Sequence, residues 1–370
     1  MSPRVPFMSL VPGEDAAVVR DAIDRVVERG WFILGPELAA FEEEFAAASG
    51  SKFAVGVGTG TDALALALRA MGIGPGDEVI TTPLSAAYSA LAIMMTGATP
   101  VFADINDERL TLDPASTEAA ITPRTAAILP VHLYGQPADM VRLSLIAERH
   151  GLAILEDACQ SHLATCAGTP VGTFGAAGAF SFYPTKNLGA LGDAGAITTD
   201  DAGFADKLKR LRNGGQIDRY HHVEFGVNSR LDEMQAAILR ARLKLLPSWT
   251  ARRRALAARY RAALAGGPVR VMAECDPGHV YHLFVVRPSD RAEFQAHMER
   301  AGIGTLIHYP VPIPRQPAFA GLPGGSCPIA DRACAEVCSI PLNPGLADAE
   351  VDAIIEAVRA WRPASAGANA

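Results

Sequence analysis

The sequence predicts an α/β protein, with a large domain built on a mostly parallel mixed sheet and a smaller C-terminal α+β domain. Two observations lead to this fold class. Between residues 53 and 157, short apolar runs alternate with longer runs whose apolar residues recur at helical spacing. Such alternation is typical of βαβ units, which place parallel strands side by side and cover the sheet with helices. After about residue 201 long helical patterns dominate, and this change of pattern indicates that a second, smaller domain follows the sheet.

Two helices are expected before the alternating region. In residues 14–29 and 36–49 apolar side chains recur every three or four positions, and the runs end at Gly30 and Gly50. Glycine often follows a helix because it adopts the left-handed conformation without steric cost.

In the alternating region the short apolar runs predict strands and the longer amphipathic runs predict helices. The expected strands are residues 53–57, 77–81, 99–105, 125–131, 152–157 and 179–183. The expected helices are residues 61–72, 86–97, 114–121 and 138–151. Ligands of such sheets bind at the carboxyl ends of the strands.

Helical patterns cover the next part of the chain, and a glycine-rich break follows them. They run over residues 201–214, 230–246 and 248–267, before a strand at 279–287 and helices near 290–301 and 347–360. We therefore expect a large domain at 1–250, a small domain at 251–362 and a disordered tail at 363–370, where the composition is simple.

Composition argues against several classes of protein. The net charge of −7 argues against a nucleic-acid-binding protein, and no uninterrupted apolar run is long enough to span a membrane. The N-terminus lacks the apolar core of a signal peptide. The six cysteines form no C-x-x-C pair, so we expect reduced thiols in a cytoplasmic protein without a metal site.

A loop rich in glycine and threonine follows the first expected strand. A helix begins at about Thr61, directly after Thr59 and Gly60. The free N–H groups and partial positive charge of a helix N-terminus suit a phosphate. Glycine and threonine are equally ordinary turn and capping residues, and the loop matches neither a Rossmann fingerprint nor a Walker A motif.

A carboxylate and a lysine follow two later strands. Asp157 ends the strand 152–157, where it could hold a cationic ring nitrogen or simply cap the next helix. Lys186 lies between an apolar strand and a loop containing Gly189 and Gly192. That setting fits a flat ligand which approaches the backbone closely, although a solvated loop lysine is the alternative.

Taken together, these groups match the needs of pyridoxal 5′-phosphate (PLP). The phosphate needs a helix N-terminus and hydroxyl groups, which Thr61 and Ser181 could supply. The ring nitrogen needs a carboxylate that keeps it protonated, and the aldehyde needs a lysine for a Schiff base.

At these residues the chain resembles the DegT/DnrJ nucleotide-sugar aminotransferases, within the fold-type I PLP enzymes. The resemblance covers about residues 30–245 and rests on stretches such as LGPELAAFEEEFA, GTDALALALRAMGIGPGDEVI, PVHLYGQPADM, LEDACQSHLA, FSFYPTKNLGALGDAGAI and NSRLDEMQAAILRARL. It implies an aspartate aminotransferase-like fold and a homodimer with shared active sites.

The resemblance also implies roles for single residues. Lys186 would form the Schiff base and move the proton between substrate and cofactor, and Asp157 would pair with the ring nitrogen. Gln160 would contact the hydroxyl edge of the ring. The phosphate would be held by Gly60, Thr61, Ser181 and, from the neighbouring subunit, Asn228.

The implied reaction is transfer of an amino group from L-glutamate to C3 of a dTDP-3-keto-6-deoxyhexose, by a ping-pong mechanism. Tyr183, where many relatives have histidine, belongs to the C3 variant. The expected substrate contacts come from Tyr183, Arg219, Tyr220, Arg230 and His308, and arginine suits a diphosphate. A solvated loop at 216–230 and an ordinary strand-end histidine at 308 are the alternatives.

Three other functions remain open from the sequence. They are a 4-keto-sugar aminotransferase, a PLP-dependent sugar dehydratase and a non-catalytic regulator. In the dehydratases the Schiff-base lysine is replaced, often by histidine, so Lys186 favours transamination. Intact Lys186 and Asp157 argue against a regulator with a decayed site.

The chain departs from the family where an aromatic residue usually stacks on the PLP ring. Ungapped alignment places Ala86 there, with Tyr88 two residues further on. Alanine has no aromatic face. We therefore expect weaker retention of PLP than in relatives, unless Tyr88 takes over the stacking.

Overall fold

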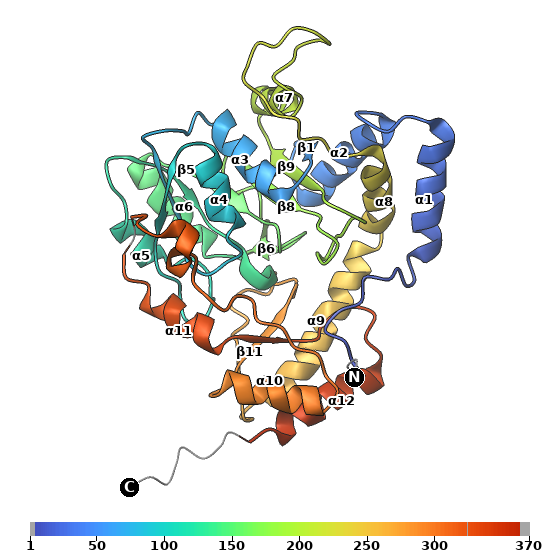
Figure 1. Ribbon diagram of the computed structural model, residues 1–370, viewed down its shortest axis with the longest axis vertical. Helices are drawn as coiled ribbons and strands as arrows, with labels where there is room; N and C mark the ends of the chain where they lie inside the picture. Colours follow the sequence, from blue (N-terminus) through green and yellow to red (C-terminus); the bar gives the residue numbers. More distant parts are fainter. Residues whose placement is uncertain (1–3, 324, 363–370) are drawn as a thin grey trace.

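The computed structural model describes residues 4–323 and 325–362, and a seven-stranded sheet forms its centre (Figure 1). The strand order is β1-β9-β8-β5-β4-β2-β3. The five strands from β8 to β3 run parallel, whereas β9 pairs antiparallel with both β1 and β8. The strands are β1 Phe53–Val57, β2 Glu78–Thr81, β3 Thr99–Phe102, β4 Thr125–Leu129, β5 Ala153–Asp157, β8 Ala177–Ser181 and β9 Gly195–Thr199. The predicted mostly parallel mixed sheet is confirmed.

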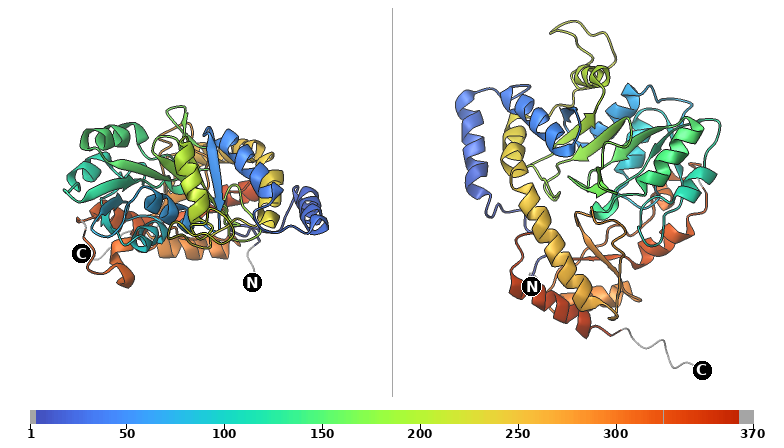
Figure 2. Two further views of the ribbon diagram at one scale, coloured as in Figure 1. Left: turned by 90° about the horizontal axis from the view of Figure 1, so that it is seen from above. Right: turned by 180° about the vertical axis from the view of Figure 1, so that it is seen from behind.

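Helices cover both faces of this sheet (Figure 2). Side chains of successive strand residues point to opposite faces, so Val79 belongs to the buried cluster that includes residues of α3, α4 and α7, whereas Ile80 belongs to the cluster that includes residues of α2, α6 and α8. The helices of the chain are α1 Ala16–Arg29, α2 Pro36–Ser49, α3 Gly60–Ala70, α4 Tyr88–Met95, α5 Pro114–Ala119, α6 Met140–His150, α7 Ala202–Leu211, α8 Glu233–Leu243, α9 Leu246–Leu264, α10 Arg291–Arg300, α11 Pro328–Glu336 and α12 Asp348–Ala360.

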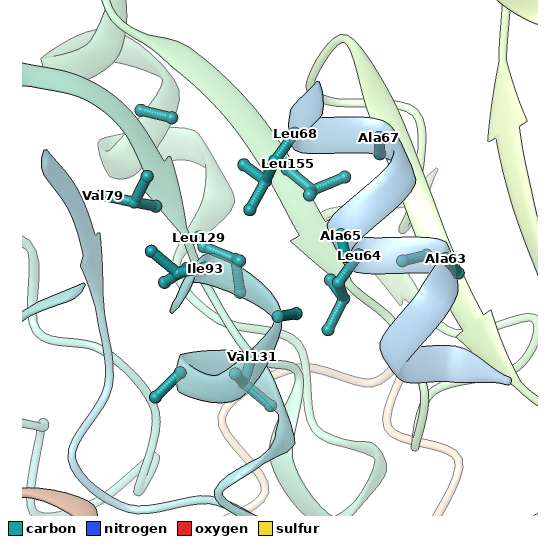
Figure 3. Close-up of a cluster of buried hydrophobic side chains, with 14 of the residues drawn as sticks. Ala63, Leu64, Ala65, Ala67, Leu68, Val79, Ile93, Leu129, Val131 and Leu155 are labelled. Atoms are coloured by element: carbon teal, nitrogen blue, oxygen red, sulfur yellow. The ribbon is translucent and has the colours of Figure 1, made fainter. Parts of the chain in front are cut away.

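The packing of α3 fixes the loop that precedes it. Leu64 and Leu68 of α3 are buried against Leu129 of β4 and Leu155 of β5, in a cluster that also includes Ile93 of α4 (Figure 3). Burying a leucine side chain stabilises the fold by about 1.5–3 kcal/mol. The N-terminus of α3 is thereby held at the carboxyl edge of the sheet.

A second sheet of three antiparallel strands lies near the C-terminal end of the chain. It packs with α9, α10 and α12 around a separate core that includes Phe294 and Trp361. Its strands are β10 Arg270–Val271, β11 Phe284–Arg287 and β12 Cys338–Ile340, and the remaining pair of short strands is β6 Thr165–Cys166 and β7 Thr169–Pro170.

The division at residues 250 and 251 falls inside α9, which runs without interruption from the large sheet to the small one (Figure 1). The N-terminal segment belongs spatially to the small sheet's side, since Val5 pairs with Ile303. The division into domains at 1–250 and 251–362 therefore remains a proposal. The expected disordered tail at 363–370 lies outside the described residues.

The structure departs from the sequence-based expectations at several elements, since α11 and the strands β6, β7, β10 and β12 are present where none was expected. The expected strand 279–287 is regular only over β11, because Val280 N–H and Leu283 N–H donate to the carbonyls of Gly135 and Tyr134 in the segment between β4 and α6. Strand β9 was not expected at all. Its short sequence, GAITT, follows a glycine-rich loop and has too few apolar residues for a clear pattern.

Candidate active site

A cavity of about 620 Å³ lies at the carboxyl edge of the large sheet. The segments that follow β1, β2, β5 and β8 contribute to its lining, together with His282 before β11 and His308 and Tyr309 after α10. Its lining includes Thr59, Gly60, Thr61, Ala86, Tyr88, Ser89, Asp157, Cys159, Gln160, Ser181, Tyr183, Lys186, Asp193, His282, His308 and Tyr309.

The N-terminus of α3 forms one wall of this cavity. Thr59 caps the helix by accepting the Asp62 N–H at 3.0 Å, while the first N–H groups of a helix have no partner within it. A Cβ on Gly60 would lie 2.6 Å from Cβ of Ser181 and 2.9 Å from Sγ of Cys159. Glycine is therefore required for the helix to approach the end of β8 this closely.

Asp157 ends β5 and is 5% exposed, so its carboxylate needs polar partners. Oδ2 accepts a 2.7 Å hydrogen bond from Oγ of Ser89, and Oδ1 accepts the N–H of Cys159 at 3.1 Å. A carboxylate oxygen can accept more than one hydrogen bond, so Asp157 retains capacity for a cationic ring nitrogen in the cavity.

Lys186 lies in the loop between β8 and β9, and its N–H donates to the carbonyl of Tyr183 at 2.8 Å. Burial lowers the pKa of its ammonium group, while Cys159 and Asp157 act in the opposite direction. Desolvation therefore favours the neutral amine, which is the nucleophilic form needed for a Schiff base.

Gln160 is buried between two tyrosines. Its Oε1 accepts the N–H of Tyr134 at 2.8 Å, and its Nε2 donates to the hydroxyl of Tyr309 at 3.1 Å. Burial raises the pKa of Tyr309 to about 12, so this hydroxyl stays protonated at neutral pH. The side-chain amide is thereby fixed in orientation at the cavity wall.

Two histidines of the C-terminal part of the chain, His282 and His308, line the cavity. Nδ1 of His308 lies 2.9 Å from Oγ of Ser339, and burial lowers its pKa to about 4. Nδ1 of His282 lies 3.2 Å from Oδ1 of Asn187, the residue after Lys186. Burial also lowers the pKa of His282 well below its ordinary value, so both rings are neutral at physiological pH and can act as hydrogen-bonding groups.

Sequence reasoning missed Ser89, His282 and Tyr309. Ser89 and His282 lie in apolar stretches that we assigned to a helix and a strand, where nothing distinguishes them from core residues. Tyr309 follows His308 in the motif IHYP, and this aromatic residue was the one available signal.

The structure brings most predicted site residues into this cavity and leaves four outside it. Gly60, Thr61, Asp157, Gln160, Ser181, Lys186, Tyr183 and His308 line it, as do Ala86 and Tyr88. Arg219, Tyr220, Arg230 and Asn228 are absent from its lining. The first two belong to a loop after α7 that projects from the body (Figure 1), and Asn228 is exposed beyond that loop.

The residues present fit PLP. Gly60 leaves room beside the end of β8, the start of α3 offers backbone N–H groups to an anion, and buried Asp157 supplies negative charge on the same cavity. Among the described residues, no group of three or more His, Cys, Asp or Glu side chains could hold a metal ion. In the same part of the chain, no helix is both long and apolar enough to cross a membrane.

Known proteins resemble this chain over nearly its whole length. The model of the DegT/DnrJ/EryC1/StrS aminotransferase family matches residues 14–359. A relative from Streptomyces venezuelae, dTDP-3-amino-3,4,6-trideoxy-alpha-D-glucose transaminase, is 50% identical, with 97% of each chain covered.

Two solved structures are similar as well. The crystal structure of S. venezuelae DesV in complex with ketimine intermediate is 50% identical, with a TM-score of 0.94, covering 97% of this chain and 99% of that one. NtdA from Bacillus subtilis, solved with bound cofactor PMP, is 32% identical, with a TM-score of 0.89, covering 97% and 85% of the two chains.

These matches confirm the resemblance seen in the sequence, together with the fold-type I architecture. The family is one of PLP-dependent enzymes, as the cavity's residues also indicate. The chain belongs to the DegT/DnrJ/EryC1/StrS aminotransferase family.

Proposed function

We propose that this protein transfers an amino group from L-glutamate to C3 of a dTDP-linked 3-keto-6-deoxyhexose, with PLP as cofactor. The observation that carries the proposal is a single cavity bounded by Lys186, Asp157 and the N-terminus of α3. The sugar is proposed from the name of the S. venezuelae relative, which is 50% identical over almost the whole chain.

Bound PLP supplies an electron sink for the negative charge that develops at the reacting carbon. The proposed role of Asp157 is to keep the ring nitrogen protonated, and Ser89 and Cys159 N–H hold its carboxylate in place. Gly60, Thr61 and Ser181 are proposed to hold the phosphate. Gln160, fixed by Tyr134 and Tyr309, is proposed to contact the ring hydroxyl.

Nζ of Lys186 is proposed to carry the proton between the substrate and the cofactor. Its lowered pKa supports this role, because a base must be neutral before it can take a proton. Tyr183, at the rim and 50% exposed, and His308 are proposed to contact the sugar. The presence of Lys186 in the cavity favours transamination over dehydration.

We also propose that the active unit is a homodimer, with Asn228 reaching the phosphate site of the partner. The loop at 216–226 supports this, because it projects from the body and exposes the apolar side chains of Ile217, Tyr220, Val223 and Phe225. Exposed apolar groups of this size are typical of contact surfaces. Arg219, Tyr220 and Arg230 are then proposed to bind the nucleotide diphosphate across the dimer.

A spectroscopic experiment tests the cofactor chemistry. The PLP-loaded protein is expected to lose its visible absorbance band on addition of L-glutamate and to regain it with a 3-keto sugar nucleotide. Lys186→Ala is expected to abolish the shift, and Lys209→Ala, an exposed lysine on α7, serves as the matched control. An unchanged shift in Lys186→Ala would overturn the proposed role of this lysine.

Parallel assays with dTDP-3-keto and dTDP-4-keto sugars test the position of amination. We expect turnover of the 3-keto sugar only. Turnover of the 4-keto sugar alone would replace the C3 proposal with the alternative that the sequence left open.

Mixed dimers test whether the site is shared. Lys186→Ala and Asn228→Ala proteins are each expected to be impaired, and mixing them should restore activity, because one hybrid site then contains both native residues. Absence of any recovery in verified mixed dimers would count against a contribution of Asn228 to the partner.

We further propose a cytoplasmic location. All six cysteines are free thiols in the structure, which supports a reducing compartment. Localisation of the tagged protein by cell fractionation is the direct check.

A further inference from the structure

A second cavity, of about 540 Å³, lies on the other side of the lysine loop. It shares Thr185 and Lys186 with the proposed PLP cavity, so the two cavities meet at this segment. Its other walls are the N-terminal segment Met8–Asp15, the start of α9 with Trp249 and Arg253, and Asn343–Gly345 after β12. Figure 1 shows the N-terminal segment, in dark blue, passing from α1 toward α9.

Arg253 is a buried, positively charged residue in the lining of this cavity. The residue is 5% exposed, and its Nη1 donates to the carbonyls of Tyr281, His282 and Leu342 at 3.2, 3.4 and 3.0 Å. Its Nε is buried and has no hydrogen-bond acceptor among the described residues. Burial lowers its pKa only to about 10, so the side chain is charged at neutral pH.

Arg242, the other arginine in the lining of this cavity, differs from Arg253 because it is paired with a carboxylate. Arg242 is also buried, but its Nε donates to Oδ2 of Asp15 at 2.7 Å, which neutralises the pair. Across the described residues, no carboxylate is paired with Arg253. The remaining acid of the lining, Glu14, accepts the indole N–H of Trp249 at 2.5 Å.

A buried cation without a counter-charge is costly, and an anion that enters beside it recovers part of that cost. A terminal nitrogen of the guanidinium, rather than the enclosed Nε, can donate a charge-assisted hydrogen bond to a carboxylate oxygen. The cavity also has ample volume for a small organic acid. These features together favour a carboxylate over a neutral ligand.

We propose that this second cavity binds a small carboxylic acid, with the guanidinium of Arg253 as its charged partner. The site is distinct from the proposed PLP cavity, and the inference does not rest on the proposed transamination. Two sources share this chemistry, namely the amino-donor pair L-glutamate and 2-oxoglutarate, or an unrelated metabolic acid.

Calorimetric titration of the PLP-loaded protein with succinate tests the proposal, and fluorescence of Trp249 in the cavity wall provides a second readout. Saturable binding is expected for succinate but not for uncharged succinamide. Arg253→Gln is expected to weaken binding by at least about tenfold, because a charge-assisted contact is lost. The fluorescence change should disappear in Trp249→Phe.

A second variant keeps the test decisive if Arg253→Gln does not fold. Ser9 is an exposed residue of this cavity's lining and does not line the PLP cavity, so Ser9→Trp should fill the space and block succinate while Arg253 is unchanged. Unchanged affinity in folded Arg253→Gln or in Ser9→Trp would overturn the proposal, as would equal binding of succinamide. Binding of phosphate without binding of succinate would overturn the carboxylate class.

Competition identifies the source of the ligand. Displacement of bound succinate by 2-oxoglutarate in the wild type would assign the site to the amino-donor pair. Failure of 2-oxoglutarate to displace bound succinate would assign it to an unrelated acid. Both results support a carboxylate site at Arg253.

Discussion

Oγ of Ser89, in the first turn of α4, donates a 2.7 Å hydrogen bond to Oδ2 of Asp157 at the end of β5. The bond joins two elements that are 68 residues apart, and both groups are buried. It orients the carboxylate that we propose as the partner of the PLP ring nitrogen.

Ser89→Ala is expected to weaken PLP binding by about fivefold, because loss of one hydrogen bond of about 1 kcal/mol frees the Asp157 carboxylate to rotate. Titration of the apoprotein with PLP measures the effect. Ser144→Ala is the matched control, since that hydroxyl has no hydrogen-bond partner among the described residues. Equal PLP affinity in the two variants would contradict the prediction.

Gly60→Ala is expected to impair both PLP binding and stability. The new Cβ would lie 2.6 Å from Cβ of Ser181, so the start of α3 and the end of β8 must separate, at a cost of about 1–3 kcal/mol. PLP titration and chemical denaturation measure the two effects. Gly74→Ala, whose Cβ would meet only an ordinary 3.5 Å contact, should be nearly neutral.

Glu233→Gln is expected to lower the free energy of unfolding by about 1–3 kcal/mol. The buried carboxylate accepts the N–H groups of Gly35, Glu37 and Leu38 at 2.8–2.9 Å and thereby caps α2. Urea denaturation measures the change, and Glu43→Gln on the exposed side of α2 is the control. A loss no larger than that of the control would show that α2 does not depend on this cap.

The pH dependence of apoprotein stability should report on Lys186. Its pKa in the folded protein lies below the ordinary value of 10.5 because the ammonium is desolvated. Between the two pKa values the unfolded chain binds the proton and the folded chain does not, so the free energy of unfolding rises with pH across that window. Below the window the penalty of burying the charge is fully present.

Unfolding of the apoprotein and of Lys186→Met, followed at several pH values from neutral to 10, tests this sign. Lys186→Met should be the more stable protein near neutral pH, and its advantage should shrink as the pH rises toward 10.5. A constant difference across this range would show that burial does not shift the lysine's pKa.

Ala86→Tyr is expected to slow the loss of PLP during dialysis. Ala86 lines the cavity and has no aromatic face, and an aromatic stacking contact contributes about 0.5–1.5 kcal/mol. The absorbance of retained cofactor measures the effect. The Tyr88→Ala variant tests whether Tyr88 already stacks on the PLP ring. If Tyr88 does so, Tyr88→Ala should lose PLP faster than the wild type during dialysis. Full retention in the dialysed wild type would contradict the expectation of weak binding.

The sequence predicted the parallel part of the sheet because its signal is local. Each strand from β1 to β5 is a short apolar run, and each intervening helix shows its period within about ten residues. The loop before α3, Asp157 and Lys186 were found for the same reason, since each lies at the carboxyl end of a strand or in the loop that follows one. In a parallel sheet that position alone brings them to one edge.

The sequence by itself determined the fold class, the family and the residues that follow the strands, because periodicity and position within a motif are written in neighbouring residues. Only the tertiary structure decided which distant side chains join them. Tyr309 reaches Gln160 across 149 residues, and Arg253 becomes a buried cation through three carbonyls of other segments. Such contacts depend on the path of the folded chain, for which a local pattern carries no signal.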